Sequence, residues 1–189
     1  MNADWLKRKH QAGLSYEQYL ATGTEQQQEN WTKVYNQVAL TDGQKNLLGG
    51  FTRQMKVIGL SGIWCGDCVV QGPMLARIAE ANPESIDLKW LDRDEHADLQ
   101  EQVRINAGNR VPVVVFCAED YELVGWYGDR TLSRYRAIAA KQLGAACPLP
   151  GAPLEEDEGA ATVSDWINEF ERVQLILRLS TRLRKKHGD

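Results

Sequence analysis

The chain has 189 residues, a formal net charge of -4 and a pI near 5.5. This length can bury one good hydrophobic core with room for extensions, and the charge gives no electrostatic case for nucleic acid or an anionic membrane as a partner. No apolar run approaches the roughly 20 residues that cross a bilayer, and the basic N-terminus lacks the apolar stretch of a secretory signal. Four cysteines are too few for a disulfide-stapled secreted scaffold. We therefore expect a cytoplasmic protein in a reducing compartment.

Residues 1–50 have the polar, helical pattern of an extension that packs on the domain after it. Ser15 and Gln18 stand at the spacing of a capping box, which predicts that a helix begins there. Further along, apolar residues recur at roughly helical spacing: Trp31, Val34, Tyr35, Val38 and Leu40. We interpret this stripe as the buried face of a helical layer.

Residues 51–146 alternate strand-like and helix-like segments and form the predicted central domain. Strands are predicted at 57–63, 86–91, 113–117 and 121–126, and helices at 68–81, 96–105 and 132–143. The unbroken apolar run of the third strand suits a central position that is covered on both faces. A strand–helix–strand unit followed by a hairpin and a helix predicts an α/β fold, with a central mixed β-sheet flanked by helices on both faces.

The composition changes after this domain. Residues 147–160 are rich in proline and acidic side chains, which is typical of a stiff linker. Residues 161–189 carry one apolar stripe, which predicts a C-terminal amphipathic helix. Acidic residues at its start and basic residues at its end complement the helix dipole. The helix dipole therefore explains the basic residues of the tail, and an RNA-binding arm is not needed to account for them.

The most informative segment is Trp-Cys-Gly-Asp-Cys at residues 64–68, between a predicted strand and a predicted helix. Two thiols separated by two residues can close a small disulfide, and a helix N-terminus places positive partial charge beside the first sulfur. Thiol–disulfide exchange needs one thiolate that attacks and a second thiol that resolves the mixed disulfide. We predict that Cys65, just before the helix, attacks, and that the more buried Cys68 resolves. Gly66 permits close packing of the turn.

Asp67 is the unusual member of this motif. Its charge beside Cys65 should oppose formation of the thiolate and partly cancel the contribution of the helix. Alternatively, Asp67 is the base that takes the proton from Cys68 when the mixed disulfide resolves. Both catalytic roles are hypotheses that rest on the position of this residue.

Three features in the same order and spacing resemble the thioredoxin family. They are the motif at residues 64–68, Pro73 five positions after the second cysteine, and Val111-Pro112 before an apolar strand. The resemblance covers about residues 57–143, and the Trp-Cys-Gly-Asp-Cys form with a helical N-terminal extension is similar to a less studied thioredoxin-like group. It implies a thioredoxin-like fold and a protein-disulfide oxidoreductase that needs no prosthetic group.

The resemblance also implies a substrate groove and partners. Pro112 would be a cis-proline beside the cysteines that offers backbone hydrogen bonds to an extended substrate. The other residues expected to line this groove are Trp64, Gly66, Val111 and Gly125. The implied partners are protein disulfides and an electron donor, either a reductase or a small thiol, and the implied role is in cell redox homeostasis.

The sequence departs from the family at two positions. Gly59 stands where thioredoxins carry a buried acid, and Asp67 stands where they usually carry proline. The proton-transfer group is therefore either relocated to Asp67 or missing. The absent export signal and the charge of Asp67 both favour a reductase over an oxidase or isomerase. The segments 1–50 and 161–189, which a minimal thioredoxin lacks, could cover part of the groove or pair two chains as a homodimer.

Two alternatives remain open. The chain could be a redox-inactive binding module, because a fold does not fix a function. It could also hold zinc or an iron–sulfur cluster through Cys65, Cys68, Cys117 and Cys147. Cys117 and Cys147 are far apart in the sequence and form no second close pair, so we expect a buried strand residue and a loop thiol instead.

Overall fold

A four-stranded mixed β-sheet organises the computed structural model, which describes residues 1–143 and 157–189. Its strands are β1 (Met55–Ser61), β2 (Ile86–Asp92), β3 (Val113–Ala118) and β4 (Leu123–Gly128), in the spatial order β2-β1-β3-β4. β1 is parallel to β2, and β3 is antiparallel to both β1 and β4. The α/β fold and mixed sheet predicted from the sequence are confirmed.

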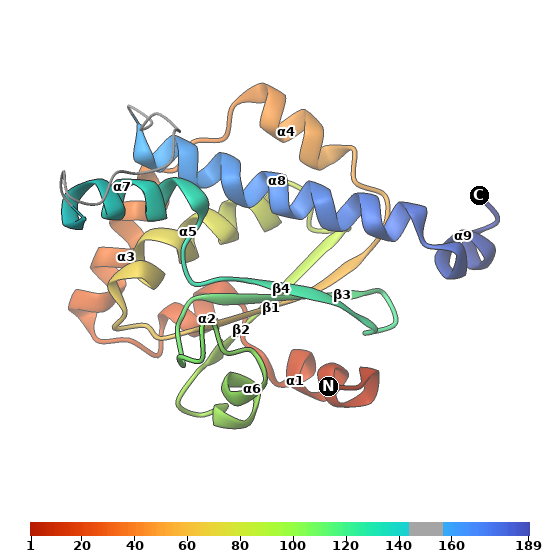
Figure 1. The fold of residues 1–189 in the computed structure, drawn as a ribbon, viewed down its shortest axis with the longest axis horizontal. Helices are drawn as coiled ribbons and strands as arrows, with labels where there is room; N and C mark the ends of the chain where they lie inside the picture. The colour runs from red at the N-terminus through yellow and green to blue at the C-terminus, as the bar shows by residue number, and fades with distance from the viewer. Residues whose placement is uncertain (144–156) are drawn as a thin grey trace.

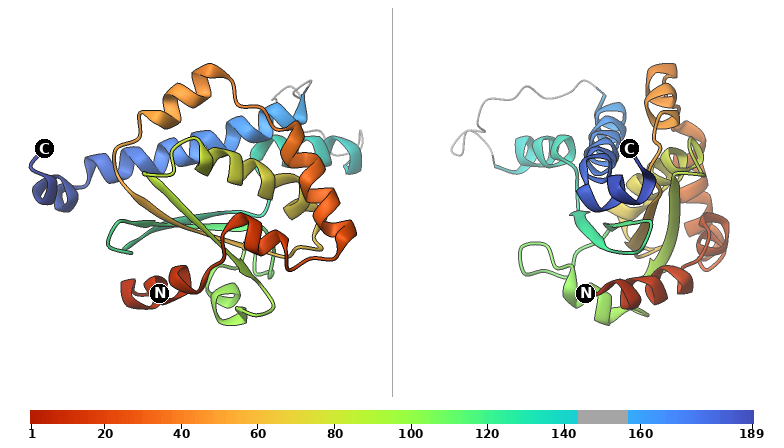
Figure 2. Two further views of the ribbon diagram at one scale, coloured as in Figure 1. Left: turned by 180° about the vertical axis from the view of Figure 1, so that it is seen from behind. Right: turned by 90° about the vertical axis from the view of Figure 1, so that its right-hand side faces the viewer.

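Helices cover both faces of this sheet, as predicted (Figure 1). α5 (Gly66–Glu80) and α8 (Glu158–Leu179) lie on one face, whereas α1 (Ala3–Ala12) and α6 (Ala97–Gln102) lie on the other, near the N-terminus (Figure 2). α7 (Leu132–Gln142) packs beside α8. Every residue of β3 is buried between these layers, which explains why its sequence is an unbroken apolar run.

The N-terminal extension is helical, as predicted. After α1 come α2 (Tyr16–Leu20), α3 (Glu25–Gln37) and α4 (Asp42–Gly49). α2, α3 and α4 each begin with a capping box, and the box of α2 is the predicted one, formed by Ser15 and Gln18. Side chains from these helices belong to the same hydrophobic core as the sheet.

A group of aromatic rings joins the extension to the sheet next to the cysteine motif. We call it the aromatic floor: Tyr16, Tyr19, Trp31 and Trp90. Tyr19 stacks on Trp90 with ring centroids 5.6 Å apart, and Trp31 meets Tyr19 edge-on at 5.7 Å. A glycine in α5 makes room for Trp31, because a Cβ at Gly72 would lie 2.2 Å from that ring. The position of α3 against α5 therefore depends on this glycine.

The segment predicted as one C-terminal helix forms two helices, which corrects the sequence-based expectation. α8 begins at Glu158, where the side chain of Asp157 caps its first turn. α8 ends at Leu179 because Ser180 leaves the helical conformation with ψ 114°, and its hydroxyl caps the following helix, α9 (Thr181–His187).

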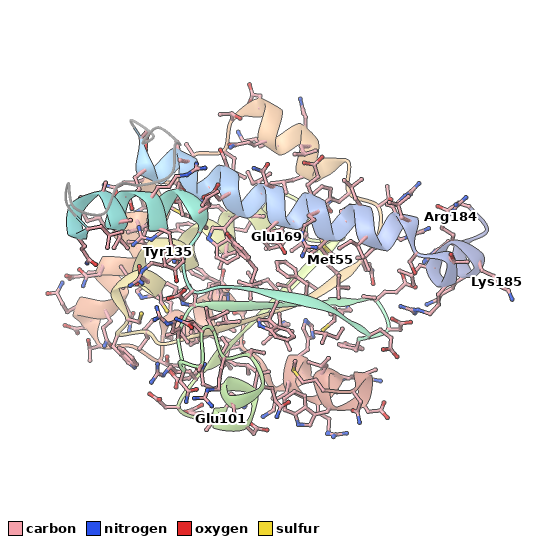
Figure 3. All side chains as sticks on the ribbon, in the orientation of Figure 1. Met55, Glu101, Tyr135, Glu169, Arg184 and Lys185 are labelled. Atoms are coloured by element: carbon pink, nitrogen blue, oxygen red, sulfur yellow. The ribbon has the colours of Figure 1, made fainter. Side chains whose placement is uncertain are left out.

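The basic tail folds back onto the turn between β3 and β4. Lys186 and His187 approach the carboxylate of Glu119 at 2.5 and 2.9 Å. Arg184 and Lys185 extend from the end of the molecule in Figure 3. Part of this basic segment therefore pairs with the β3–β4 turn, in addition to its favourable interaction with the helix dipole.

Three further details differ from the sequence-based expectation or lie beyond it. α6 is shorter than the predicted helix over 96–105, because Val103 leaves the helical conformation with φ -118° and ψ 30°. α5 runs from Gly66 to Glu80 with Pro73 inside it, where a kink or break was expected. Residues 144–156, which include most of the predicted linker, lie outside the described residues.

None of the helices in the described part of the chain is long and apolar enough to cross a bilayer.

Candidate active site

Cys65 is the N-cap residue of α5, at the point where the chain has left β1. Its amide donates to the carbonyl of Gly62 at 2.9 Å, and the buried indole N–H of Trp31 donates to the carbonyl of Ile63 at 3.0 Å. These two bonds fix the turn that presents the first cysteine. Its side chain makes no capping hydrogen bond to the first turn of α5, so the sulfur lies beside the N-terminal end of the helix.

The two thiols of the motif have opposite electrostatic surroundings. The pKa of the half-buried Cys65 is lowered to about 6, chiefly because the Cys68 thiol donates a hydrogen bond to its sulfur; two backbone amides act in the same direction, against the effect of burial. Cys68 is completely buried, and burial followed by the neighbouring Cys65 raises its pKa well above the usual value. At neutral pH the pair therefore holds one thiolate and one thiol.

Val111 and Pro112 lie against Cys65. The peptide bond between them is cis, as the family resemblance implies. The carbonyl oxygen of Val111 is 3.7 Å from the sulfur of Cys65, although the valine side chain itself is buried. Trp64 is 53% exposed beside the motif, and no heavy atom of another element lies within 4 Å of a Cβ built on Gly66. The structure thus brings Val111 and Pro112 from far along the chain to Cys65, whose neighbours in the sequence are Trp64 and Gly66.

Gly125 is not part of this group. It pairs with Phe116, four residues along β3 from Pro112, or roughly 13 Å at the usual rise of a strand. Gly128 lies nearer to Pro112: it pairs with Val113, has φ +150°, and a Cβ there would lie 2.3 Å from the carbonyl oxygen of Pro112. Gly125 stays a prediction as a groove residue, and Gly128 is the glycine of β4 that lies against Pro112.

The carboxylate of Asp67 is held by two arginines that follow β4. Arg130 approaches one oxygen at 2.6 Å and Arg134 the other at 2.7 Å. Arg134 also pairs with Glu158 of α8 at 3.0 Å. We call Asp67, Arg130, Arg134 and Glu158 the charged rim. Because both oxygens of Asp67 face guanidinium groups, its charge opposes the Cys65 thiolate less than burial does.

The position of the buried acid of thioredoxins is occupied differently in this chain. Gly59 pairs directly with Trp90 across β1 and β2. A Cβ at Gly59 would lie 2.9 Å from the Trp90 ring. The aromatic floor therefore fills the space that a carboxyl side chain at this position would need.

The described cysteines do not support the four-thiolate arrangement. In residues 1–143 and 157–189, no group of three or more His, Cys, Asp or Glu side chains is placed to hold a metal ion. Cys117 is buried five residues along β3 from Pro112, and burial raises the pKa of its thiol to about 12. It is a core residue, as predicted, whereas Cys147 lies outside the described residues.

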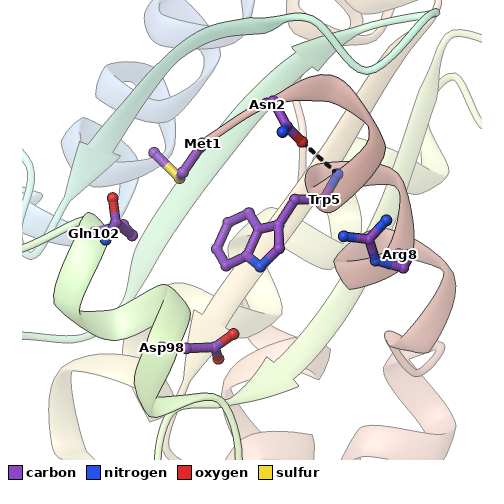
Figure 4. A pocket seen from close by; sticks show the side chains of 6 residues that line it. All are labelled: Met1, Asn2, Trp5, Arg8, Asp98 and Gln102. Carbon is purple, nitrogen blue, oxygen red and sulfur yellow. Dashed lines mark hydrogen bonds between the residues drawn. The ribbon is translucent and has the colours of Figure 1, made fainter.

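Two surface pockets show where a ligand could reach the protein. One lies between α1 and α6 and contains none of the site residues; Figure 4 shows its lining by Met1, Asn2, Trp5, Arg8, Asp98 and Gln102. The other adjoins the cysteine motif at Trp64 and is bordered by Asp92 and Glu95. Of these two pockets, the second is the one that touches the cysteine motif.

Sequence reasoning missed Arg130 and Arg134 as neighbours of the motif. The available signal is two arginines four residues apart at the start of α7, Arg130 just before the N-cap Thr131 and Arg134 inside the helix. That signal does not say which acid they meet, because β4 brings them to α5 from far along the chain.

Comparison with known proteins identifies the family from the sequence. A sequence profile of the family described as Thioredoxin matches residues 13–140. This chain belongs to the thioredoxin family. The match includes most of the N-terminal extension as well as the segment that carries the motif. No curated protein sequence matches the chain.

Two solved structures, the first two named here, share this fold over nearly the whole chain. A protein of unknown function from Pseudomonas aeruginosa is 16% identical with a TM-score of 0.68, over 89% of this chain and 94% of its own. An HIV epitope scaffold is 16% identical with a TM-score of 0.64, over 90% of this chain and 99% of its own. Mitochondrial thioredoxin 3 of Saccharomyces cerevisiae is 24% identical with a TM-score of 0.34, over 50% of this chain and 86% of its own.

Proposed function

We propose that this thioredoxin-family protein is a thiol–disulfide oxidoreductase that reduces disulfides in other proteins. The Cys65 thiolate attacks one sulfur of a substrate disulfide, a mixed disulfide forms, and the first substrate sulfur leaves as a thiolate. Cys68 then gives up its proton and attacks the sulfur of Cys65. The second substrate sulfur leaves and takes up a proton, so that two electrons pass to the substrate. A reductase or a small thiol returns the Cys65–Cys68 disulfide to the dithiol.

The observation that carries this proposal is the pairing of two unlike thiols at the start of α5. The pKa of Cys65 is lowered to about 6, so most of this thiol is ionised at neutral pH and ready to attack. The pKa of the buried Cys68 is raised, so it keeps its proton until a mixed disulfide has formed. A binding module without turnover would not need this difference between the two thiols.

The groove residues support an extended protein substrate. The carbonyl of Val111 lies 3.7 Å from the attacking sulfur, so a substrate strand beside Pro112 would bring its own disulfide to Cys65. The exposed ring of Trp64 and the open space at Gly66 leave this approach clear. Gly128 belongs to the same groove, because it packs against Pro112.

The pKa of Cys65 also bears on the direction of electron flow. A thiolate that the fold stabilises favours the dithiol form and makes a protein less reducing. A pKa of about 6 lies closer to thioredoxin, at about 7, than to strong oxidants, at about 3.5. We therefore propose a reductase with a potential somewhat above that of thioredoxin, between about -270 and -200 mV.

A disulfide-reduction assay tests the proposal. With insulin as the substrate and dithiothreitol as the electron donor, the wild-type protein should accelerate reduction. Cys65→Ser should abolish the acceleration, and Cys68→Ser should accumulate a mixed disulfide with the substrate that is visible by mass spectrometry. Cys117→Ser is the matched control and should keep the activity, because Cys117 lies in the core away from the site. A wild-type protein without any acceleration would leave the binding module as the better account.

A further inference from the structure

Two buried hydroxyl groups lie next to the resolving cysteine. Ser61 ends β1 and is 0% exposed, and Tyr19 reaches the same place from α2 and is 1% exposed. Ser61 lies close to both Tyr19 and Cys68 and lowers the pKa of each, against the larger effect of burial. Neither hydroxyl makes a well-formed hydrogen bond with any group in the described ranges 1–143 and 157–189.

Buried hydroxyl groups without a good partner are costly, so their position beside a reactive thiol calls for an explanation. The ring of Tyr19 cannot turn away from the site, because it stacks on Trp90 and meets Trp31 edge-on. Trp90 in turn fills the space at Gly59, where thioredoxins carry their buried acid. The aromatic floor thus excludes a carboxyl group at Gly59 and holds the Tyr19 hydroxyl group near Ser61 and Cys68.

These hydroxyl groups can act as donors and not as bases. Burial raises the pKa of Tyr19 further above its usual value, so the phenol keeps its proton over the whole working range of pH. A hydroxyl group that keeps its proton can donate a hydrogen bond to a thiolate. Ser61 can donate to the sulfur of Cys68 while it accepts from Tyr19, and such chains strengthen each bond.

We propose that Ser61 and Tyr19 are positioning residues that stabilise the thiolate formed on Cys68 while it resolves the mixed disulfide. The inference deepens the proposed function and rests on it. The proton of Cys68 ends on the departing substrate sulfur, and the two hydroxyl groups keep their own protons throughout. An N-terminal helix, which a minimal thioredoxin lacks, would thereby take part in the resolving step.

Other charged and titratable groups around Cys68 also affect the pH dependence of its reaction. Cys65 is the closest, and its own charge is lost once it is part of the mixed disulfide. Asp67 shares α5 with Cys68, but its carboxylate is held by Arg130 and Arg134. Asp92 lies near Tyr19 and also raises the pKa of that phenol. The hydroxyl groups of Tyr19 and Ser61 are neutral donors. Tyr19→Phe and Ser61→Ala each remove one of them.

Reaction with 5,5′-dithiobis(2-nitrobenzoate) separates the two steps. The attack of Cys65 releases a first thionitrobenzoate anion, and the attack of Cys68 on the resulting mixed disulfide releases a second. Tyr19→Phe should slow the second release about tenfold, as expected for one lost hydrogen bond to a charged group, and shift its pH midpoint upward. The rate of the first release should not change. Ser61→Ala should act in the same direction.

Tyr16→Phe is the matched control for Tyr19→Phe. Tyr16 belongs to the same helix and the same aromatic floor, and its hydroxyl is also buried without a well-formed partner among the described residues, but it stacks on Tyr35 at 5.3 Å. Tyr16→Phe should leave both releases unchanged. The inference is overturned if Tyr19→Phe and Ser61→Ala leave the second release unchanged, or if Tyr16→Phe slows it equally. A wild-type protein without any second release would instead refute the exchange mechanism itself.

Discussion

The two sides of the Cys65–Cys68 pair are lined by different kinds of side chain. On the outer side, the charged rim surrounds the start of α5 with Asp67, two arginines and Glu158. On the inner side, the aromatic floor supplies only rings and buried hydroxyl groups. The outer thiol has a lowered pKa and the inner thiol a raised one. The comparison teaches that a thioredoxin sheet places the two cysteines, while helices added at both ends of the chain shape what surrounds them.

The largest effect should come from disturbing the aromatic floor. Gly72→Ala would place a Cβ 2.2 Å from Trp31, so it should destabilise the fold by about 2–3 kcal/mol and lower the Tm by roughly 5–10 °C. Gly49→Ala is the control, since it also lies in a helix but has no neighbour within 4 Å. It should leave the Tm unchanged or raise it slightly. Equal Tm values for the two variants would show that Trp31 does not need this glycine.

The charged rim can be tested by removing its acid. Asp67→Asn leaves Arg130 and Arg134 without their shared partner next to Cys65. The pKa of Cys65 should therefore fall below about 6, by about half a unit to one unit, which is measurable from the pH dependence of iodoacetamide alkylation. In the wild-type protein this rate should rise with pH through about 6 and level off above it, because only the thiolate reacts. A pKa that stays the same would exclude an electrostatic effect of Asp67 on Cys65, and an unchanged pH–rate profile of disulfide exchange would exclude both roles considered for Asp67.

Removing one of the arginines should have the opposite and smaller effect. Arg134→Met keeps much of the side-chain volume but leaves Asp67 with Arg130 alone. The pKa of Cys65 should rise by roughly half a unit or less, because a less compensated carboxylate disfavours the thiolate. The same alkylation assay measures this shift. A pKa that falls in this variant would mean that Asp67 does not act through its charge.

The smallest effect is expected far from the dithiol. Lys186→Ala removes an exposed partner of Glu119 at the β3–β4 turn. Pairs of this kind contribute about 0–1 kcal/mol, so the midpoint of urea unfolding should hardly move. Activity in the insulin assay should not change. A large loss of stability would mean that α9 contributes more to the stability of the fold than its surface ion pairs indicate.

Local signals in the sequence predicted much of this structure. The capping box at Ser15, the strand of residues 113–117 and the position of Cys65 before α5 follow from side-chain patterns within a few residues. The features that were missed depend on contacts between distant segments. Arg134 meets Asp67, and Tyr19 reaches Cys68, only after the sheet and the helices have assembled. The break at Ser180 and the register shift between Phe116 and Cys117 are instead confined to one or two residues each.

A redox titration tests the central claim most directly. The purified protein would be equilibrated in glutathione or dithiothreitol buffers, and alkylation with mass spectrometry would measure the oxidation state of Cys65 and Cys68 at each potential. The account predicts one reversible two-electron transition between about -270 and -200 mV. A transition near about -120 mV would contradict the reductase assignment. No reversible transition at all would contradict the claim that these two cysteines exchange disulfides.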